Sequence, residues 1–270
     1  MNRTTHVEKK TRNLQWVPLG KIKVSPVAQR PRNDNWVEEL FNAFDPDLMG
    51  TPEVNERDDG FCYVMDGQHR IAVVKRWLGQ GWENQCVQCW VTKELSEQEE
   101  AETYLTLNKQ RNSNALNEFK IALVAQRPVE LEIEAQLKDL NLCISRQAVE
   151  GAISCVGAVK RVHKKAGVEV LRKSLRMTRD AYGDPGLISP VISGMGLICQ
   201  RYNGAVDEDI LVKALSTVKG GIGALLGRAH QIKQKTGSPL AHSVAAGIVE
   251  ICNRRRGGRK LPSWWKTTEN

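Results

Sequence analysis

The pattern of apolar residues changes near Thr92, and this change restricts the possible folds more than any other feature of the sequence. Before it, short alternating or apolar stretches typical of strands are mixed with stretches of helical spacing, and after it only helical spacing continues. A strand, a turn, a helix and a further strand in succession are the order of a small α/β unit. We therefore expect an α+β fold, with a small mixed N-terminal domain followed by an all-α C-terminal domain.

The helix boundaries follow from capping residues. Ser96 and Glu99 form a capping box, Asn114 is suited to cap a second helix, and Pro128 is suited to the first turn of a third. Glycine-rich breaks then separate further helices. In the first part, strands are expected at 16–24, 60–65 and 85–91, and helices at 33–44 and at 70–78, where Gly79 ends the helix. In the second part, the breaks fall at 167, 183–186, 203–204, 220–221 and 237–239.

Charge is unevenly distributed between the two parts of the chain. Residues 1–142 carry 18 Lys and Arg against 22 Asp and Glu, a net charge of −4, whereas residues 143–270 carry 21 against 9, a net charge of +12. The second part is therefore the one that would attract phosphate groups, although a solvated basic surface is the alternative. We place the domain boundaries at 1–126 and 127–253, with a basic flexible tail at 254–270.

Composition indicates a soluble globular protein of the cytoplasm. Hydrophobic residues make up 41% of the chain and charged residues 26%. We expect no membrane association, because no apolar run has the length of a membrane span and the N-terminus lacks the apolar core of a signal peptide. The seven cysteines are odd in number, which favours reduced thiols over a disulfide framework. Cys86 and Cys89 form a lone pair without zinc-site spacing, so buried thiols on a strand are the simpler interpretation.

The segment Asp66-Gly67-Gln68-His69-Arg70 lies where a strand is expected to end and a helix to begin. Unpaired backbone N–H groups and the positive end of the helix dipole favour an anion at such a point. Gly67 would allow the backbone to approach a phosphate closely, and Arg70 would supply a charged, forked donor. Gln68 and His69 would add neutral donors. The alternative is a tight Asp-Gly turn with Arg70 on the surface.

These residues, together with two further motifs, resemble the ParB/sulfiredoxin superfamily over roughly residues 16–120. The ordered counterparts of its three boxes are Gln29-Arg30-Pro31-Arg32, Gly67-Gln68-His69-Arg70 and Leu107-Asn108-Lys109-Gln110-Arg111. The "DGQHR" variant is similar to DGQHR-domain proteins and to ParB-like "nuclease" proteins of phages and plasmids. The resemblance implies a ParB-like nucleotide-binding domain in residues 1–126.

The resemblance also implies a ligand, which is CTP or ATP with Mg²⁺. Phosphate contacts would come from the 67–70 loop, and Asn108 would contact phosphate and the metal. Independently of the family, Asn108 falls on the otherwise apolar face of a helix, where it needs a partner or else ends the helix. The nucleotide-binding residues implied are Gln29, Arg30, Arg32, Gly67, Gln68, His69, Arg70, Asn108 and Arg111.

Departures from the family pattern bear on catalysis. Leu107 stands where chromosomal ParB has a glutamate linked to hydrolysis, so we expect slow or absent NTP hydrolysis, with Asp66 as the candidate catalytic carboxylate. Gln68 occupies the position of the sulfiredoxin cysteine, which excludes sulfinic-acid reduction. No carboxylate cluster typical of a metal-dependent nuclease is recognisable in the sequence.

The basic second part contains the candidate DNA-binding residues. Phosphate binding by such a surface is salt-sensitive and independent of sequence. Residues 137–156 could form a helix-turn-helix with Ser145 capping its second helix. The tail combines arginines with Trp264 and Trp265, which suits nucleic acid or else a disordered, solubilising end. The candidates are Lys160, Arg161, Lys164, Lys165, Arg172, Lys173, Arg176, Arg179, Arg254, Arg255 and Arg256.

The function that these features predict is nucleotide-dependent DNA binding of the ParB type, in DNA partition, regulation or phage DNA transactions. The partners would be nucleotide and DNA in the bacterial cytoplasm or nucleoid, with a homodimer as a further expectation. One alternative is a ParB-like nuclease or an enzyme associated with DNA modification. Another is a DNA-binding regulator whose nucleotide pocket is vestigial.

Overall fold

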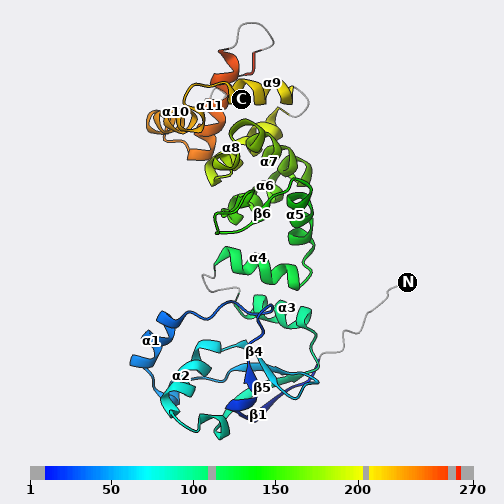
Figure 1. Cartoon of the computed structure of the whole chain (residues 1–270), viewed down its shortest axis with the longest axis vertical. Coiled ribbons are helices and arrows are strands. Elements are labelled where there is room, and N and C mark those ends of the chain that lie inside the picture. Colours follow the sequence, from blue (N-terminus) through cyan, green and yellow to red (C-terminus); the bar gives the residue numbers. More distant parts are fainter. Residues whose placement is uncertain (1–9, 109–113, 203–206, 255–259, 263–270) are drawn as a thin grey trace, which may run out of the picture. The chain divides into compact units, whose positions relative to one another are not determined.

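The computed structural model describes residues 10–108, 114–202, 207–254 and 260–262. The chain forms two compact units, Met1–Glu130 and Leu131–Asn270, which divide within helix α5 (Pro128–Asp139). The first unit is a mixed sheet with helices and the second is helical, so the predicted α+β fold is confirmed (Figure 1). Among the described residues no single helix has the length and apolarity to cross a membrane, and only α9 with α10 meets both criteria as a pair, bent by 95°.

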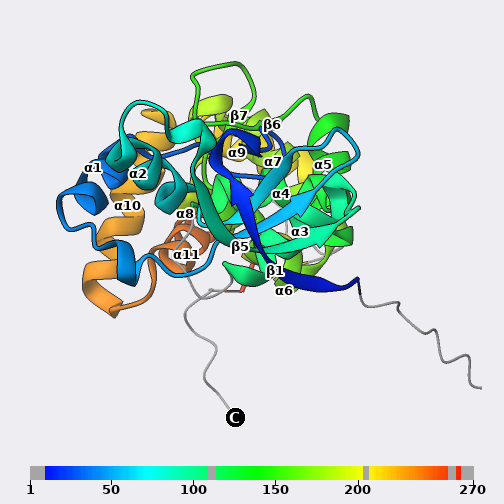
Figure 2. The same ribbon diagram turned by 90° about the horizontal axis from the view of Figure 1, so that it is seen from below.

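A five-stranded sheet forms the centre of the first unit. Its order is β1-β5-β3-β4-β2, in which β1 pairs antiparallel with β5, and β3 pairs parallel with β5 and antiparallel with β4. Strands β1 and β5 run side by side in Figure 2. The sheet packs around fully buried Leu19, Val54 and Cys89. The strands are β1 (Arg12–Pro18), β2 (Ile22–Lys23), β3 (Glu53–Glu56), β4 (Cys62–Asp66) and β5 (Cys86–Lys93).

Two strand predictions need correction. The single strand expected at 16–24 is wrong, because β1 ends at Pro18, a 3₁₀ turn follows at Leu19–Lys21, and β2 pairs at the opposite edge of the sheet. Proline fixes φ and provides no N–H donor, so the ladder cannot continue through it. Strand β3 was not predicted at all. Its four residues, Glu-Val-Asn-Glu, have too few apolar positions to show a period.

The CxxC pair lies on opposite faces of β5. Cys86 is exposed, so the expectation of a buried thiol fails there, whereas Cys89 is completely buried. Burial raises the pKa of the Cys89 thiol to about 12. A thiol with such a pKa stays protonated and unreactive at neutral pH.

The helices of the first unit begin and end where local chemistry predicts. The capping box at Ser96 and Glu99 is formed, the Asn114 side chain accepts the N–H of Leu116, and Gly79 ends α2. Helix α1 packs beside α2, and α3 packs against β4 and α4 (Figure 1). The helices are α1 (Asp34–Asn42), α2 (Gln68–Leu78), α3 (Glu97–Leu107) and α4 (Ala115–Val124), with 3₁₀ turns at Pro46–Leu48 and Trp82–Asn84.

Helix α8 (Ser189–Arg201) lies at the centre of the second unit and contacts α6, α7 and α11. Two of its glycines allow this packing. A Cβ on Gly194 would lie 2.6 Å from Val244 of α11, and one on Gly196 would lie 2.8 Å from Val162 of α6. The other helices are α6 (Val156–Ala166), α7 (Val168–Tyr182), α9 (Glu208–Ser216), α10 (Gly221–Thr236) and α11 (Leu240–Asn253), with a 3₁₀ turn at Asp184–Gly186.

The helix-turn-helix predicted at 137–156 is wrong. After α5 the chain forms a parallel pair of two-residue strands, β6 (Cys143–Ile144) and β7 (Ala152–Ile153), and the next helix begins at Val156. The Ser145 hydroxyl accepts the N–H of Gln147 in a turn and does not cap a helix. Gly151 has φ 71° and donates its N–H to Asp184. The β6–β7 pairing within the segment and the bond from Gly151 to Asp184 outside it hold these residues in a non-helical conformation.

Candidate functional site

A pocket of about 410 Å³ lies at the N-terminus of α2, directly after β4. Most of the residues that the sequence singles out for nucleotide binding meet there. Helices α1 and α3 add three residues that were not predicted, Trp36, Leu40 and Tyr104. The predicted residues that line it are Gln29, Arg30, Asp66, Gly67, Gln68, His69, Arg70 and Asn108.

Gly67 makes the turn from β4 into the helix. Its φ of 98° lies in the left-handed region, where a side chain is costly. An added Cβ would also lie 3.1 Å from both Pro52 and the Arg70 guanidinium. Gly67 has no side chain to cap α2, and the positive end of the helix dipole faces the pocket.

The two arginines of the pocket have different surroundings. The guanidinium of Arg70 donates to the Met49 carbonyl at 3.1 Å and to the Asp66 carboxylate at 2.9 Å, with its side chain 28% exposed. Arg30 is half-buried, and its guanidinium has no hydrogen-bond or ion-pair partner among the described residues. Arg30 is therefore the arginine with donors available to an anion, while Arg70 already stabilises the loop. Asp66, the candidate catalytic carboxylate, is the ion-pair partner of Arg70.

Two neutral side chains predicted to bind the nucleotide, Gln29 and His69, hold the backbone around the pocket. Gln29 donates to the carbonyls of Val64 and Met65 at the end of β4. His69 Nε2 accepts the N–H of Asn33, which is the cap of α1. These bonds keep the starts of α1 and α2 beside each other at the pocket.

Gln68 has a buried oxygen that lacks a partner. Its Nε2 donates to the Arg30 carbonyl at 3.2 Å, which orients the amide. The Oε1 atom is buried and has no hydrogen-bond partner among the described residues, and the residue as a whole is only 5% exposed. A buried acceptor without a donor is unfavourable by roughly 1–3 kcal/mol. A ligand donor or a cation in the pocket would remove this cost.

Asn108 lies at the C-terminal end of α3 and is 6% exposed. Its Nδ2 donates to the Tyr104 carbonyl at 2.9 Å, so the buried amide has the partner that its position requires. Asn108 ends the helix and also lines the pocket. The structural role and the predicted binding role are therefore compatible.

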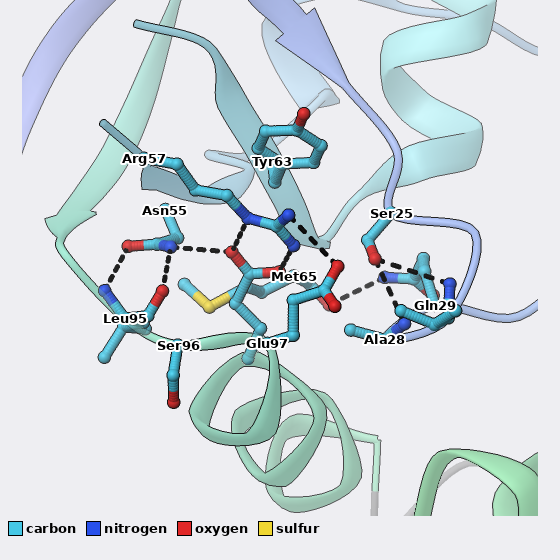
Figure 3. A network of polar contacts seen from close by, with 12 residues as sticks. Ser25, Ala28, Gln29, Asn55, Arg57, Tyr63, Met65, Leu95, Ser96 and Glu97 are labelled. Atoms are coloured by element: carbon cyan, nitrogen blue, oxygen red, sulfur yellow. Dashed lines mark hydrogen bonds and ion pairs between the residues drawn. The ribbon is translucent and has the colours of Figure 1, made fainter. Parts of the chain in front are cut away.

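A network of polar contacts fixes α3 to the sheet and so places Asn108 (Figure 3). The Glu100 carboxylate, 3% exposed, accepts two hydrogen bonds from Arg57, at 2.6 and 2.8 Å, and one from Asn55 at 2.6 Å. Asn55 is fully buried and also bonds the N–H and the carbonyl of Leu95. The hydrogen bonds with Glu100 raise the pKa of Arg57, which keeps the guanidinium charged.

Trp36 forms part of the pocket wall that sequence analysis missed. Its indole is 46% exposed although it lines the pocket, and half-buried Leu40 lies one turn further along α1. In the sequence, Trp36 and Leu40 satisfy the spacing of a core-facing helix, so nothing local separates them from core residues.

The remaining predicted residues lie elsewhere. Arg32 forms an exposed ion pair with Asp34 at 2.6 Å and does not line the pocket. Leu107 is 39% exposed and also lies outside it. Arg111 falls outside the described residues. In the described parts of the chain, no group of three or more His, Cys, Asp or Glu side chains is arranged to hold a metal.

The predicted DNA-binding residues divide between two helices. On α7, Arg172 pairs with Asp139, both Lys173 and Arg176 pair with Glu208, and Arg179 pairs with Glu150 and Asp184. These carboxylates neutralise the face that the sequence presents as basic.

Three of the four predicted cations on α6 have no carboxylate partner among the described residues. Lys164 and Lys165 are exposed and their ammonium groups have no partner among the described residues. Arg161 makes only a long contact, 3.5 Å, to the Ser189 hydroxyl. Lys160 is half-buried on the same helix and Arg254 is exposed at the end of α11, whereas Arg255, Arg256 and the tail tryptophans fall outside the described residues.

Together, the fold and the site define an α+β unit with a polar pocket at a helix N-terminus, followed by a basic helical unit. The chain belongs to the family described as "Family of unknown function (DUF6551)", whose profile matches residues 25–233. No curated protein matches the chain. Among solved structures, similarity is found to the C-terminally truncated chromosome-partitioning protein ParB from Caulobacter crescentus complexed with CTP-gamma-S. It has 13% identity and a TM-score of 0.31, and covers 89% of this chain and 97% of that one.

Proposed function

We propose that the N-terminal unit binds a nucleoside triphosphate, CTP or ATP, with its phosphates at the start of α2. The observation that carries the proposal is one pocket that combines the start of α2 at Gly67 with two groups that have no partner among the described residues, the Arg30 guanidinium and the buried Oε1 of Gln68. Helix ends and guanidinium groups are the usual donors to phosphate.

A nucleotide fits this pocket better than a simple anion does. The volume of about 410 Å³ lies in the range of small-molecule sites, and Trp36 and Leu40 offer an apolar surface to a base. Mg²⁺ bound to phosphates needs only one or two protein oxygens, and the amide oxygen of Gln68 is suited to supply one. When bound, the ion would offset the negative charge of the phosphates in the pocket.

Thermal unfolding with each of the four NTPs, with and without Mg²⁺, tests the proposal. We expect CTP or ATP with Mg²⁺ to raise the Tm, because a ligand at 100 times its Kd stabilises the native state by about 2.7 kcal/mol. Sodium triphosphate serves as the control for an effect of charge alone. An unchanged Tm at millimolar concentrations of every NTP would exclude a nucleotide site.

Slow or absent hydrolysis accompanies the proposed binding. A water molecule attacking the γ-phosphate needs a group that orients or deprotonates it. Leu107 cannot do so, and Asp66 is engaged by Arg70. The pocket is thus suited to hold a nucleotide as a switch that changes how the chain meets DNA or a second copy of itself.

For the second unit we propose binding to the DNA backbone through α6. The supporting observation is that, in the part of the chain that the structure describes, Arg161, Lys164 and Lys165 have no carboxylate partner, whereas the basic residues of α7 form ion pairs. A cation already held by a carboxylate gains less from a phosphate, because it must first lose its partner.

Lys164→Ala and Arg172→Ala separate the two helices. We expect the slope of log affinity against log salt concentration to decrease in magnitude by about 0.9 in Lys164→Ala, one phosphate contact, and hardly to change in Arg172→Ala. Fluorescence anisotropy of a labelled duplex over a range of NaCl concentrations measures both slopes. If the salt dependence decreased equally in the two variants, Arg172 would contact DNA in spite of its ion pair with Asp139, which would contradict the proposal.

A further inference from the structure

A second pocket, of about 460 Å³, lies wholly within the helical unit. It is lined by α6, by α8 along most of its length and by the first turn of α11. Because the nucleotide pocket lies in the other unit, this pocket is independent of the proposed nucleotide site. Its volume is in the range of cavities that bind small molecules.

The floor of this pocket is apolar. Val162 from α6, Leu197 from α8 and Leu240 from α11 line it, together with Gly196, where α8 packs closely against Val162. The floor therefore offers contact to a hydrocarbon or aromatic group, with a gain of about 25 cal/mol for each Å² removed from water.

The polar groups around the floor are mainly donors. Arg161 and Lys165 stand on α6 without carboxylate partners among the described residues, and no Asp or Glu is among the residues that line the pocket. The Ser193 Oγ is buried and has no hydrogen-bond partner in the described part of the chain. Helices α8 and α11 both begin at the pocket and neither start has a side-chain cap. Charge and hydrogen-bonding capacity thus point to one kind of ligand, an anion.

We propose that this pocket binds a small amphiphilic anion, a carboxylate or phosphate carried on a short apolar body. The anionic head would contact Arg161, Lys165 and the Ser193 hydroxyl, and the body would cover Val162, Leu197 and Leu240. Such a ligand satisfies the buried hydroxyl and the two cations at once. A purely apolar ligand would leave them unsatisfied, and a cationic one would be repelled.

Octanoate, octyl phosphate and octylamine are the probes that test this site, with isothermal calorimetry for affinity and ¹³C-methyl NMR for location. We expect octanoate or octyl phosphate to bind and to shift the methyl signals of Val162, Leu197 and Leu240, and octylamine to bind at least tenfold more weakly. The anion that binds with the higher affinity shows whether the pocket prefers a carboxylate or a phosphate headgroup. Equal binding of octylamine, or anion binding that leaves these methyl signals unmoved, would overturn the proposal.

Two neighbouring lysines give a matched control. Lys165 lines the pocket and Lys164 does not, although both are exposed on α6. Lys165→Ala should weaken binding of the anionic probe roughly tenfold, the lower range for a charged hydrogen bond, and Lys164→Ala should leave it unchanged. Lys164→Ala is the variant expected to weaken DNA binding, so failure of the DNA proposal and failure of this one are distinguishable. Equal losses in the two variants would indicate diffuse charge attraction and no site.

A cavity-filling variant tests the pocket without changing charge. Ser193→Leu replaces the unpartnered hydroxyl with an apolar group that would extend into the cavity, so it should abolish probe binding while the Tm of the free protein is retained. If Ser193→Leu does not fold, the comparison of Lys165→Ala with Lys164→Ala tests the proposed site instead. Full probe affinity in a folded Ser193→Leu would place the ligand elsewhere.

Discussion

Replacing Glu100 with alanine should cost the N-terminal unit about 3 kcal/mol of folding free energy, because the change removes the buried carboxylate of a largely buried guanidinium and leaves it only the exposed one of Glu97. Arg57 is 22% exposed and donates two of its hydrogen bonds to Glu100, and the fully buried Asn55 donates another. Because Arg57 is partly accessible to solvent, the expected loss of folding free energy is at the lower end of the range for breaking a buried ion pair. Helix α3 would also loosen, so nucleotide binding should weaken through the displaced Asn108.

Glu97→Ala is the matched control. Glu97 contacts the same arginine at 3.1 Å, but its side chain is 50% exposed, and an exposed pair contributes about 1 kcal/mol or less. Urea unfolding followed by tryptophan fluorescence reports mainly on the first unit, because five of the seven tryptophans lie between Trp16 and Trp90. If Glu100→Ala lost no more stability than Glu97→Ala, the buried network would not be what fixes α3.

Arg30→Ala is expected to lower nucleotide affinity ten- to hundredfold, since a hydrogen bond from a charged donor to phosphate is worth about 1.5–3 kcal/mol. The guanidinium lines the pocket and has no partner among the described residues, so its loss should not alter the Tm of the ligand-free protein. Calorimetric titration with the NTP that gives the largest thermal shift measures the affinity. Arg32→Ala is the control, because Arg32 pairs with Asp34 outside the pocket and its removal should change nothing.

Arg70→Ala should behave differently from Arg30→Ala. Arg70 holds the Met49 carbonyl and the Asp66 carboxylate, so its removal is expected to lower both the Tm of the free protein and the affinity for nucleotide. Unchanged affinity in Arg30→Ala, together with a loss confined to affinity in Arg70→Ala, would assign the phosphate contact to Arg70 and contradict our interpretation of the pocket.

Residues close together in the chain determined much of this fold. The box of Ser96 with Glu99, the cap at Asn114 and the stop at Gly79 involve hydrogen bonds or backbone angles within a few residues, so the sequence alone places those helix ends. The succession of β4, Gly67 and α2 is equally local, and it predicted where the pocket would lie. The 143–153 segment was mispredicted because a pair of two-residue strands is too short to show a period, and because the Asp184 carboxylate that accepts the Gly151 N–H is 33 residues away.

The tertiary structure decided what each side chain of the site does. The sequence alone could not show that Asn55 would meet Glu100, 45 residues away, or that Gln29 would bond the end of β4, 35 residues away. It likewise presents α6 and α7 as one basic surface, whereas packing brings Asp139 and Glu208 against α7 and leaves Lys164 and Lys165 of α6 unpaired. Local hydrogen bonds fix where a helix begins and ends, but only packing decides which distant groups compete for a guanidinium or an amide, and hence which of them a ligand can still reach.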